Sequence, residues 1–504
     1  MNKQRNRVLI FCVSEMAPDL VRKWSSDLPT FSQLADSGVS GHTRYCVPYY
    51  LTPQMWATIN TGTMPGTHGL FDYRQRAADG IFRETNGGDV HGPCWWRFLE
   101  QSGLRVGVVN LPLTFPPRMS NGFMISGQDA PGGHPSIMTP EQIFTDLERQ
   151  FGRYHLKDVF PGGQDRQAYA SILASEIKRQ SSVFKWIATN QDWDCLVLYT
   201  SGVAMAQHYY WYDMENNTEY GDVIKNSFMA TDRMLGSVIE AINEKNLNIC
   251  VVSECGAGPI ASGVNLNAAL KKAGLLAYHG DNALRMTGRR FERKFLSTVR
   301  TTAQRYVPKK LFYAANRSFL RKWILGRLAT QGIDWSRTRA FHRGKGEGNI
   351  YLNIKGRDIG GVVDPSERNV VIEQIRRALN DLRGPDGENP ILAIHKREDL
   401  FNGPYIETAP DIVIEWRNSA YMPTERDHEN DPLFGERWRE YMSWPTSGSH
   451  RPEGLFLAAG PNVRAKSSIE TVRLVDIAPL WLAMNGVAIP ARMEGILRQD
   501  LLVH

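Results

Sequence analysis

The sequence lacks several features that would place it in a specialised class of protein. Its six cysteines are scattered, with no CxxC pair and no short cysteine-dense framework, which favours reduced thiols. No apolar run approaches the roughly 20 residues that a membrane-spanning helix needs. Near the amino terminus an apolar run of about seven residues is followed by no small-residue cleavage site, which argues against a signal peptide. Internal repeats and low-complexity tracts are also missing. We therefore expect a soluble, cytoplasmic protein.

The net charge of +6 is unevenly distributed along the chain. Residues 281–343 contain sixteen Lys and Arg against three acids, a balance of +13, so the rest of the chain stands at −7. Apolar residues recur in this segment at roughly helical spacing, which predicts two basic amphipathic helices separated near Pro308. The simplest interpretation is an inserted helical pair with a solvated basic face. The alternative is a surface that contacts an acidic protein, a membrane surface or a phosphorylated substrate. Nucleic acid is disfavoured because no known binding motif accompanies the charge.

Apolar runs alternate with helical patterns along the chain. The expected strands lie within residues 7–14, 105–112, 194–202 and 247–256, and the clearest helices within 28–38 and 227–246. This order predicts an α/β fold with a mostly parallel sheet and helices on both faces. We interpret residues 1–504 as a single domain into which residues 281–343 are inserted as a basic helical segment. Since such sheets bind ligands at the carboxyl ends of their strands, the residues that follow each strand are the candidates for function.

Four places after strands carry polar or metal-binding residue types. They are Ser14 with Glu15, the turn from Ser201 to His208, the pair Glu254 and Cys255 in "NICVVSECGAGP", and His450 in "SGSHRPEG". A fifth place supplies a hydroxyl. Thr52 precedes Pro53, a pattern that predicts Thr52 as the cap of a helix with Pro53 in its first turn. A hydroxyl beside the free N–H groups of a helix start suits attack on a phosphate or sulfate ester, although an ordinary cap has the same pattern.

Several stretches together resemble the alkaline phosphatase superfamily, specifically its type I phosphodiesterase/nucleotide pyrophosphatase branch. They include "TPQMWATINTGTMPGTHGLFDY", "AQHYYW", "NICVVSECGAGP" and "GSHRPEGLFLAAGP", which occur in the family's order over nearly the whole chain. The resemblance implies the alkaline phosphatase fold and a pair of zinc ions about 4 Å apart, one beside a Thr or Ser nucleophile and one holding the ester oxygens. Thr52 matches the nucleophile position, and His208 and His450 match two histidine ligands.

The remaining metal-ligand positions of this family are occupied by other residue types in this sequence. Glu254 and Cys255 stand where an Asp and a His are expected, and both residue types still bind zinc. Ser14 and Ala204 stand where two Asp ligands are expected and supply no carboxylate. Glu15 follows Ser14 at a position where the family has Gly. Glu15 is a conceivable substitute ligand, except that neighbours on a strand point to opposite faces of the sheet.

These substitutions predict a metal site that holds at most one ion. With one carboxylate and one thiolate in place of three Asp, two divalent ions at close range would be poorly neutralised. We expect one zinc ion at a hybrid site that uses His208, His450 and either Cys255 or Glu254, and an empty site is the alternative. Substrate contacts are expected from His342, Arg343 and Lys345, which could meet an anion.

Three functions follow from these residues. The first is a phosphodiesterase- or phosphatase-like hydrolase or transferase that acts on a small anionic or carrier-linked ester with Thr52 as nucleophile. The second is an enzyme with new chemistry, in which Cys255 beside His208 and His450 attacks an acyl or other electrophilic centre. The third is a non-catalytic relative that binds a ligand or partner. An enzyme is favoured over a binding protein.

Overall fold

The computed structural model describes residues 7–48, 50–76, 82–130, 134–152, 165–279, 333–343, 348–424, 432–435 and 446–503. Most of the basic segment predicted over 281–343, and Lys345, lie outside these residues, so the two-helix prediction stays a prediction. No helix among the described residues is long and apolar enough to cross a membrane. The predicted cytoplasmic location and the single-domain organisation also stay predictions.

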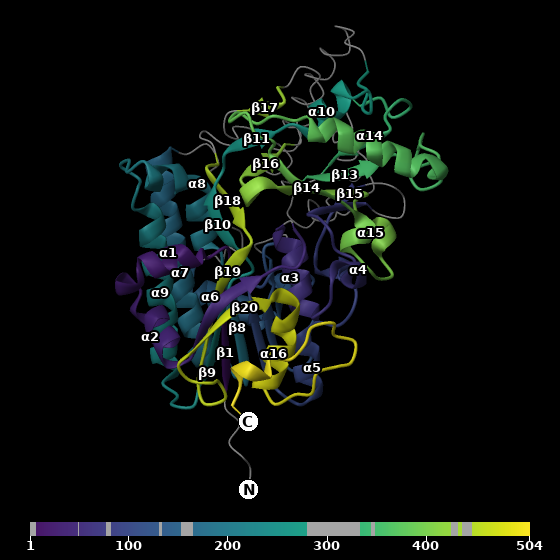
Figure 1. The fold of residues 1–504 in the computed structure, drawn as a ribbon. Helices are drawn as coiled ribbons and strands as arrows, with labels where there is room; N and C mark the ends of the chain where they lie inside the picture. Colours follow the sequence, from purple (N-terminus) through teal and green to yellow (C-terminus); the bar gives the residue numbers. More distant parts are fainter. Residues whose placement is uncertain are drawn as a thin grey trace, which may run out of the picture.

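The main body is built on a nine-stranded sheet (Figure 1). Its strand order is β20-β2-β19-β9-β1-β8-β5-β6-β7, and five of the eight pairings among the described residues are parallel. The strands in this order are β20 Ser467–Arg473, β2 Val39–Arg44, β19 Glu453–Ala459, β9 Asn248–Val252, β1 Val8–Val13, β8 Cys195–Thr200, β5 Val106–Val109, β6 Gly122–Ile125 and β7 Met138–Thr139. The predicted α/β architecture is confirmed.

Alternate residues of the central strand pack against helices on opposite faces of the sheet. Leu9, Phe11 and Val13 belong to one core cluster, whereas Val8 and Ile10 belong to the other, as the two-residue period of a strand requires. The first face is covered by α2 Pro29–Ser37, α7 Arg166–Asn190, α8 Gly202–Glu215 and α9 Val223–Ile242, and the second by α3 Thr52–Thr61, α5 Trp95–Gln101 and α16 Ile477–Met484 (Figure 1). Because helices cover both faces of the sheet, its central strands consist of nearly continuous apolar residues.

A smaller unit with its own hydrophobic core lies above the main body in Figure 1. It contains a four-stranded sheet in the order β12-β13-β15-β14, covered by two helices. The elements are β12 Ala340–His342, β13 Asn349–Leu352, β15 Ile412–Trp416, β14 Ile391–Lys396, α10 Leu266–Lys272 and α14 Arg368–Asn380. The Asn349 side-chain amide donates to Asp72 Oδ2 at 2.9 Å, and Arg76 pairs with Asp358, so polar contacts join the two parts.

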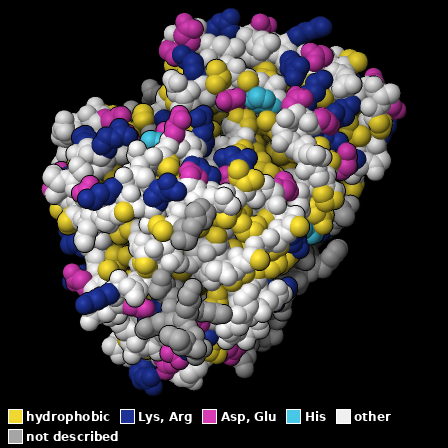
Figure 2. Space-filling view, turned by 60° about the horizontal axis from the view of Figure 1, so that its bottom comes forward, with side chains coloured by type: hydrophobic (Ala, Val, Ile, Leu, Met, Phe, Trp, Pro, Cys, Tyr) yellow, Lys and Arg dark blue, Asp and Glu magenta, His cyan; other side chains and the backbone are white. Residues whose placement is uncertain are grey.

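Short strands form further small sheets among the described residues. β16 Tyr421–Pro423, β11 Ser262–Val264 and β17 Phe434–Gly435 form one small sheet, and β10 Gly256–Pro259 pairs with β18 Gly448–Arg451 in another. On the face shown in Figure 2, Lys and Arg side chains are interspersed with Asp and Glu. The described part of that face therefore has no broad surface of one charge.

Asp411 is the main ionic contact within the smaller unit. Its buried carboxylate accepts two hydrogen bonds from Arg357, at 2.9 and 2.8 Å, and one from the Leu352 backbone N–H at 2.9 Å. Arg368 Nε adds a contact of 3.3 Å. Burial alone would raise the pKa of Asp411, but the Arg357 guanidinium outweighs burial and the pKa lies below its ordinary value. This carboxylate fixes the register of β13 beside β15.

Replacing Asp411 with asparagine is expected to lower the free energy of unfolding by about 2–3 kcal/mol at pH 7, since Arg357 and Arg368 lose their shared anion. The loss is smaller than for a fully buried pair because the Arg357 and Arg368 side chains keep 19% and 20% exposure. A depressed carboxyl pKa adds stability above the unfolded pKa, and this contribution disappears as pH falls toward the folded pKa. Denaturant titrations should therefore show the difference at pH 7 and a shrinking difference below about pH 4. Asp500→Asn, which breaks a pair whose carboxylate is 52% exposed, should cost less than about 1 kcal/mol.

Candidate functional site

The carboxyl ends of three adjacent parallel strands meet at one edge of the main sheet. β1 lies between β8 and β9, with Val13 paired to Thr200 and Cys12 paired to Val252. Ser14 and Glu15 therefore follow β1 at the same edge where Glu254 follows β9 and where α8 begins after β8. The structure thus brings Ser14, Glu15 and Glu254 to the edge at which the sequence predicts that ligands bind.

Three side chains converge there as a candidate metal-binding group. Glu15 Oε1 lies 3.1 Å from His208 Nε2 and 3.1 Å from His450 Nε2, and one ligand atom from each residue lies within 4.8 Å of the others. His208 comes from the second turn of α8, and His450 comes from β18, where it pairs with Ala257 of β10. Among the described residues, no other three His, Cys, Asp or Glu side chains form such a group. The third member is Glu15, whereas the sequence favoured Cys255 or Glu254.

Glu15 reaches the histidines because its backbone adopts the left-handed conformation. β1 ends at Val13, so the alternation of a strand no longer applies to residue 15, which has φ of 56°. Three contacts hold this turn. The Gln207 side-chain amide donates to the Glu15 carbonyl at 2.6 Å, the Met16 N–H donates to Ser253 Oγ at 2.8 Å, and the Glu15 N–H approaches Glu254 Oε2 at 3.4 Å. The objection that neighbouring residues point to opposite faces is therefore wrong at this position.

Burial and charge make Glu15 a strong anion in this group. Burial alone would raise its pKa, but the His208 and His450 imidazoles outweigh burial and hold the pKa of Glu15 far below its ordinary value. Burial alone would likewise lower the pKa of His208, but the Glu15 carboxylate raises it above its ordinary value. Glu15 Oε2 is buried and has no hydrogen-bond partner among the described residues. A buried carboxylate oxygen of this kind leaves bonding capacity for a further group.

Glu254 lies behind the candidate metal group and bonds to Ser14. The Ser14 hydroxyl donates to Glu254 Oε1 at 2.7 Å, and both side chains are buried. Burial and the nearby Glu15 charge raise the pKa of Glu254 to about 7, although the Ser14 hydrogen bond opposes the rise. Near neutral pH this carboxyl is thus only partly ionised. The two positions that would serve a second zinc are instead joined in a hydrogen-bonded pair.

Cys255 and Thr52 occupy different environments from those that the sequence suggested. Cys255 has no exposed surface and belongs to the core cluster on the α3 face of the sheet, so the structure does not favour it as an accessible nucleophile. Thr52 does lie at the start of α3, but it is the first helical residue, and Leu51 is the cap residue. The prediction that Thr52 itself caps the helix is wrong by one residue. Its side chain is only partly buried, while the rest of α3 is buried.

The predicted substrate-binding residues lie in the smaller unit. His342 is buried on β12, where its Nδ1 lies 2.8 Å from the Asn349 carbonyl and its backbone N–H donates to Asn267 Oδ1 at 2.7 Å. The Arg343 guanidinium lies over the Phe82 ring, 5.1 Å from its centroid. Neither residue is among those that line the pocket described in the next paragraph, which lies beside His450. Lys345 lies outside the described residues. Their role in binding substrate stays a prediction.

A pocket adjoins the candidate metal group on the side of His450. Its lining residues come from the loop before α3, from the stretch that runs from the end of β15 to the start of β16, and from β18; they are Pro48, Tyr50, Trp416, Ser419, Tyr421, Ser449 and His450. Tyr50 is two residues before Thr52, so this pocket brings the start of α3 and the candidate metal group to one region. No motif in the sequence marks Tyr50, Trp416 or Tyr421, because Tyr50 is distant along the chain from the other two.

A family model matches most of the chain. The sequence model of the type I phosphodiesterase/nucleotide pyrophosphatase family matches residues 8–449. The chain belongs to this family. Members are typically zinc dependent, and family membership supports a hydrolase of the phosphodiesterase or pyrophosphatase type. No curated protein sequence shows a significant match to the chain.

Solved structures of the same fold include human ectonucleotide pyrophosphatase/phosphodiesterase 5, with a TM-score of 0.51 and 13% sequence identity over 99% of this chain and 100% of that one. An inactive variant of the murine protein in complex with AMP matches with a TM-score of 0.52, 13% identity and the same coverage. At this identity the likeness shows the fold alone, and it confirms the alkaline-phosphatase-like architecture.

The residues present fit one zinc ion. Two imidazoles and one carboxylate are a common set of three protein ligands for a catalytic zinc, which keeps a fourth position open. His208 Nδ1 lies 2.8 Å from the Gly448 carbonyl, so a proton on Nδ1 leaves the Nε2 lone pair directed at the group. The buried, unpartnered Glu15 Oε2 adds a further donor atom. A second ion finds no comparable group of three ligands among the described residues.

Proposed function

We propose that this protein is a hydrolase or transferase of anionic esters, of the phosphodiesterase type, with a site remodelled to use one metal ion. Glu15, His208 and His450 hold the ion, and Thr52 is the nucleophile. The observation that carries the proposal is the convergence of these three ligands at the strand edge. Glu15 supplies the carboxylate that is missing at position 204, where this chain has Ala instead of the expected Asp. The substrate is a small anionic ester, whether free or linked to a carrier.

Each residue has a defined task in this proposal. A bound zinc ion would act as a Lewis acid that polarises an oxygen of the phosphoryl group. The Glu15 carboxylate lowers the positive charge of the group, and the Gly448 carbonyl keeps His208 in the tautomer that presents Nε2. Thr52 lies in the first turn of the ten-residue helix α3, whose free N–H groups favour an anion beside the attacking hydroxyl.

The electrostatics of the site agree with one ion rather than two. Glu15 is the only carboxylate in the three-ligand group, and the neighbouring Glu254 has its pKa raised to about 7 because it is buried beside that charge. A second divalent ion would meet too little negative charge at close range. Glu254 Oε1 instead accepts a hydrogen bond from the Ser14 hydroxyl.

The proposal is tested by the metal content and activity of protein purified without chelator. Inductively coupled plasma mass spectrometry is expected to find about one zinc or similar ion per chain, as three protein ligands with one open position predict. Hydrolysis of bis(4-nitrophenyl) phosphate should cease after chelation and return when zinc is restored. A protein that binds no metal even from added zinc would contradict the proposed site. A loaded protein that hydrolyses no phosphodiester would contradict the proposed reaction.

A further inference from the structure

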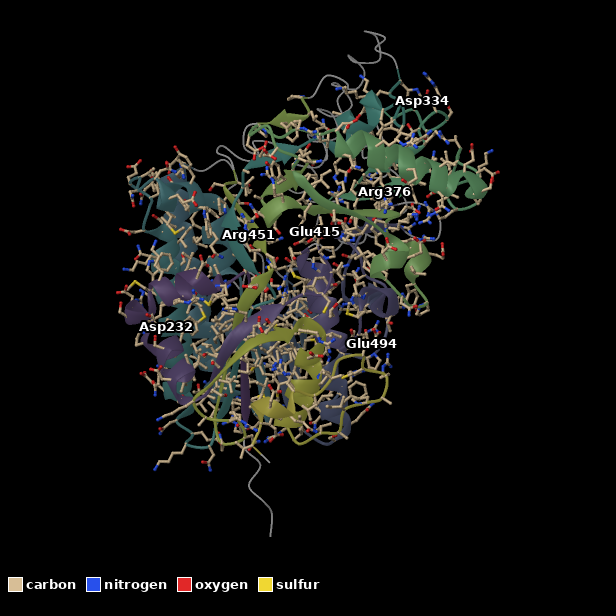
Figure 3. All side chains as sticks on the ribbon, viewed as in Figure 1. Asp232, Asp334, Arg376, Glu415, Arg451 and Glu494 are labelled. Carbon is tan, nitrogen blue, oxygen red and sulfur yellow. The ribbon has the colours of Figure 1, made fainter. Side chains whose placement is uncertain are left out.

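Arg451 follows the candidate ligand His450 on β18 and lies where the smaller unit meets the main body (Figure 3). Neighbouring residues of a strand point to opposite faces, so the Arg451 side chain extends from the face of β18 opposite to the His450 imidazole. We infer that Arg451 is a positioning residue through which the smaller unit sets the place of His450 in the metal group. The inference rests on the proposed function, because it concerns an ion held by Glu15, His208 and His450.

The Arg451 guanidinium donates to backbone carbonyls of three segments. Nη1 donates to the His450 carbonyl at 2.8 Å and to the Ser419 carbonyl at 2.7 Å, and Nη2 donates to the Pro259 carbonyl. Pro259 is the last residue of β10, and Ser419 ends the turn between β15 and β16, whose flanking residues belong to the core of the smaller unit. A planar guanidinium presents its donors in a fixed arrangement. One side chain therefore holds the ligand strand, its hairpin partner and the smaller unit together.

The backbone on both sides of Arg451 fits this role. A Cβ at Gly258 of β10 would overlap Arg451 Nε, so the missing side chain at this position leaves room for the guanidinium. On the other side, Asn418 and Ser419 adopt left-handed conformations in succession, with φ of 54° and 49°. Non-glycine residues stay in this region only where surrounding contacts hold them. The hydrogen bond from Arg451 to the Ser419 carbonyl is such a contact, and it links the strained turn to the ligand strand.

A displacement of β18 would disturb two of the three candidate ligands. His450 Nε2 lies 3.1 Å from Glu15 Oε1, and the carbonyl of Gly448, two residues before His450, lies 2.8 Å from His208 Nδ1. The strand that Arg451 holds thus carries one ligand and orients another. Because zinc binds its ligands at short, well-defined distances, a looser strand should bind the ion less tightly.

Arg451→Met is expected to weaken zinc binding by about 10-fold or more, as loss of a residue behind a ligand typically does. Competition with a chromogenic zinc chelator, using the full chain, measures the dissociation constant. The visible absorption spectrum of the cobalt(II)-loaded protein reports the ligand geometry and should change in the same variant. Arg451→Lys keeps one charged donor and should recover part of the affinity. Arg383→Met is the matched control, because Arg383 Nη1 also donates to backbone carbonyls, those of Asn380 and Leu382 at 3.2 and 2.8 Å, outside the metal group.

Substitutions at Ser419 test the coupling from the side of the smaller unit. Ser419→Gly keeps the left-handed turn, which glycine adopts without strain, and should keep the wild-type zinc affinity. Ser419→Val disfavours that turn, because β-branched residues rarely adopt positive φ, and should weaken zinc binding by about threefold or more. In the Arg451→Met background, Ser419→Val should have no further effect, since the contact that couples the two sites is already lost.

The results that would overturn the inference differ from those that would contradict the proposed function. Equal zinc affinity and equal cobalt spectra of wild type, Arg451→Met and Ser419→Val would overturn the positioning role and leave the metal site standing. Should Arg451→Met fail to fold, the Ser419 pair decides, because equal affinity of its valine and glycine forms would also overturn the inference. A wild-type protein that binds no zinc would contradict both proposals.

Discussion

Glu15→Gln is expected to remove nearly all bound metal, leaving less than about one tenth of an ion per chain after dialysis. The amide keeps the size of the side chain but removes the only carboxylate in the three-ligand group. Loss of a ligand should cost more than the 10- to 100-fold in affinity that typically follows loss of a residue behind a ligand. Mass spectrometry of the metal, at one fixed free zinc concentration for both proteins, measures the effect.

A matched control is available in the smaller unit. Glu415 Oε2 lies 2.9 Å from His395 Nε2, so it also contacts an imidazole, but it lies outside the three-ligand group. Glu415→Gln should keep about one ion per chain, as an intact ligand set predicts. Glu15→Gln with wild-type zinc affinity would show that Glu15 is not a ligand.

A double substitution tests whether Glu15 has taken over the role of the Asp that the family has at residue 204. Ala204 is buried on α8, one turn before His208, and therefore shares a helix face with that histidine. Glu15→Gly alone should lose the metal while keeping the left-handed turn, which glycine adopts without strain. Adding Ala204→Asp should restore binding, because a carboxylate then enters the group from the helix. No recovery in the double variant would argue against this exchange of positions.

Thr52→Ala is expected to reduce phosphodiester turnover by at least about 1,000-fold while leaving the metal content unchanged, since removal of a nucleophile is among the largest effects in hydrolases. Thr52 is not a member of the three-ligand group, so metal binding should not depend on it. Thr52→Ser keeps a hydroxyl at the start of α3 and should retain measurable turnover. Steady-state kinetics with bis(4-nitrophenyl) phosphate, at saturating zinc, provide the comparison.

Cys255→Ala distinguishes the second function that the sequence suggested. Under the proposed reaction this variant keeps its turnover, because Cys255 has no exposed surface and lies outside the metal group. Lost turnover in a folded Cys255→Ala protein that retains its zinc, together with full activity of Thr52→Ala, would reverse the assignment in favour of the thiol. Full activity of both variants would exclude both nucleophiles. A non-catalytic binding protein is indicated if the zinc-loaded wild type hydrolyses no ester.

Much of the fold could be predicted from local sequence. The strands expected within residues 7–14 and 247–256 form β1 and β9, and the helix expected within 227–246 forms most of α9. Such predictions succeed because continuous apolar runs and helical periodicity are local properties of the chain. The start of α3 was misplaced by one residue, since Leu51 is its cap residue without a capping side chain.

The sequence by itself determined the alternation of strands and helices in the main body, the edge at which ligands are expected, and two of the three candidate ligands, His208 and His450. Only the tertiary structure decided that Glu15 is the third. Its side chain turns toward the histidines because its backbone is left-handed, and that conformation is held by Gln207 and Glu254, which are 192 and 239 residues away along the chain. Contacts between such distant segments leave no periodic pattern in the sequence. The pocket beside His450 depends on tertiary structure for the same reason, because Tyr50, Trp416 and His450 become neighbours only when the smaller unit packs on the main body.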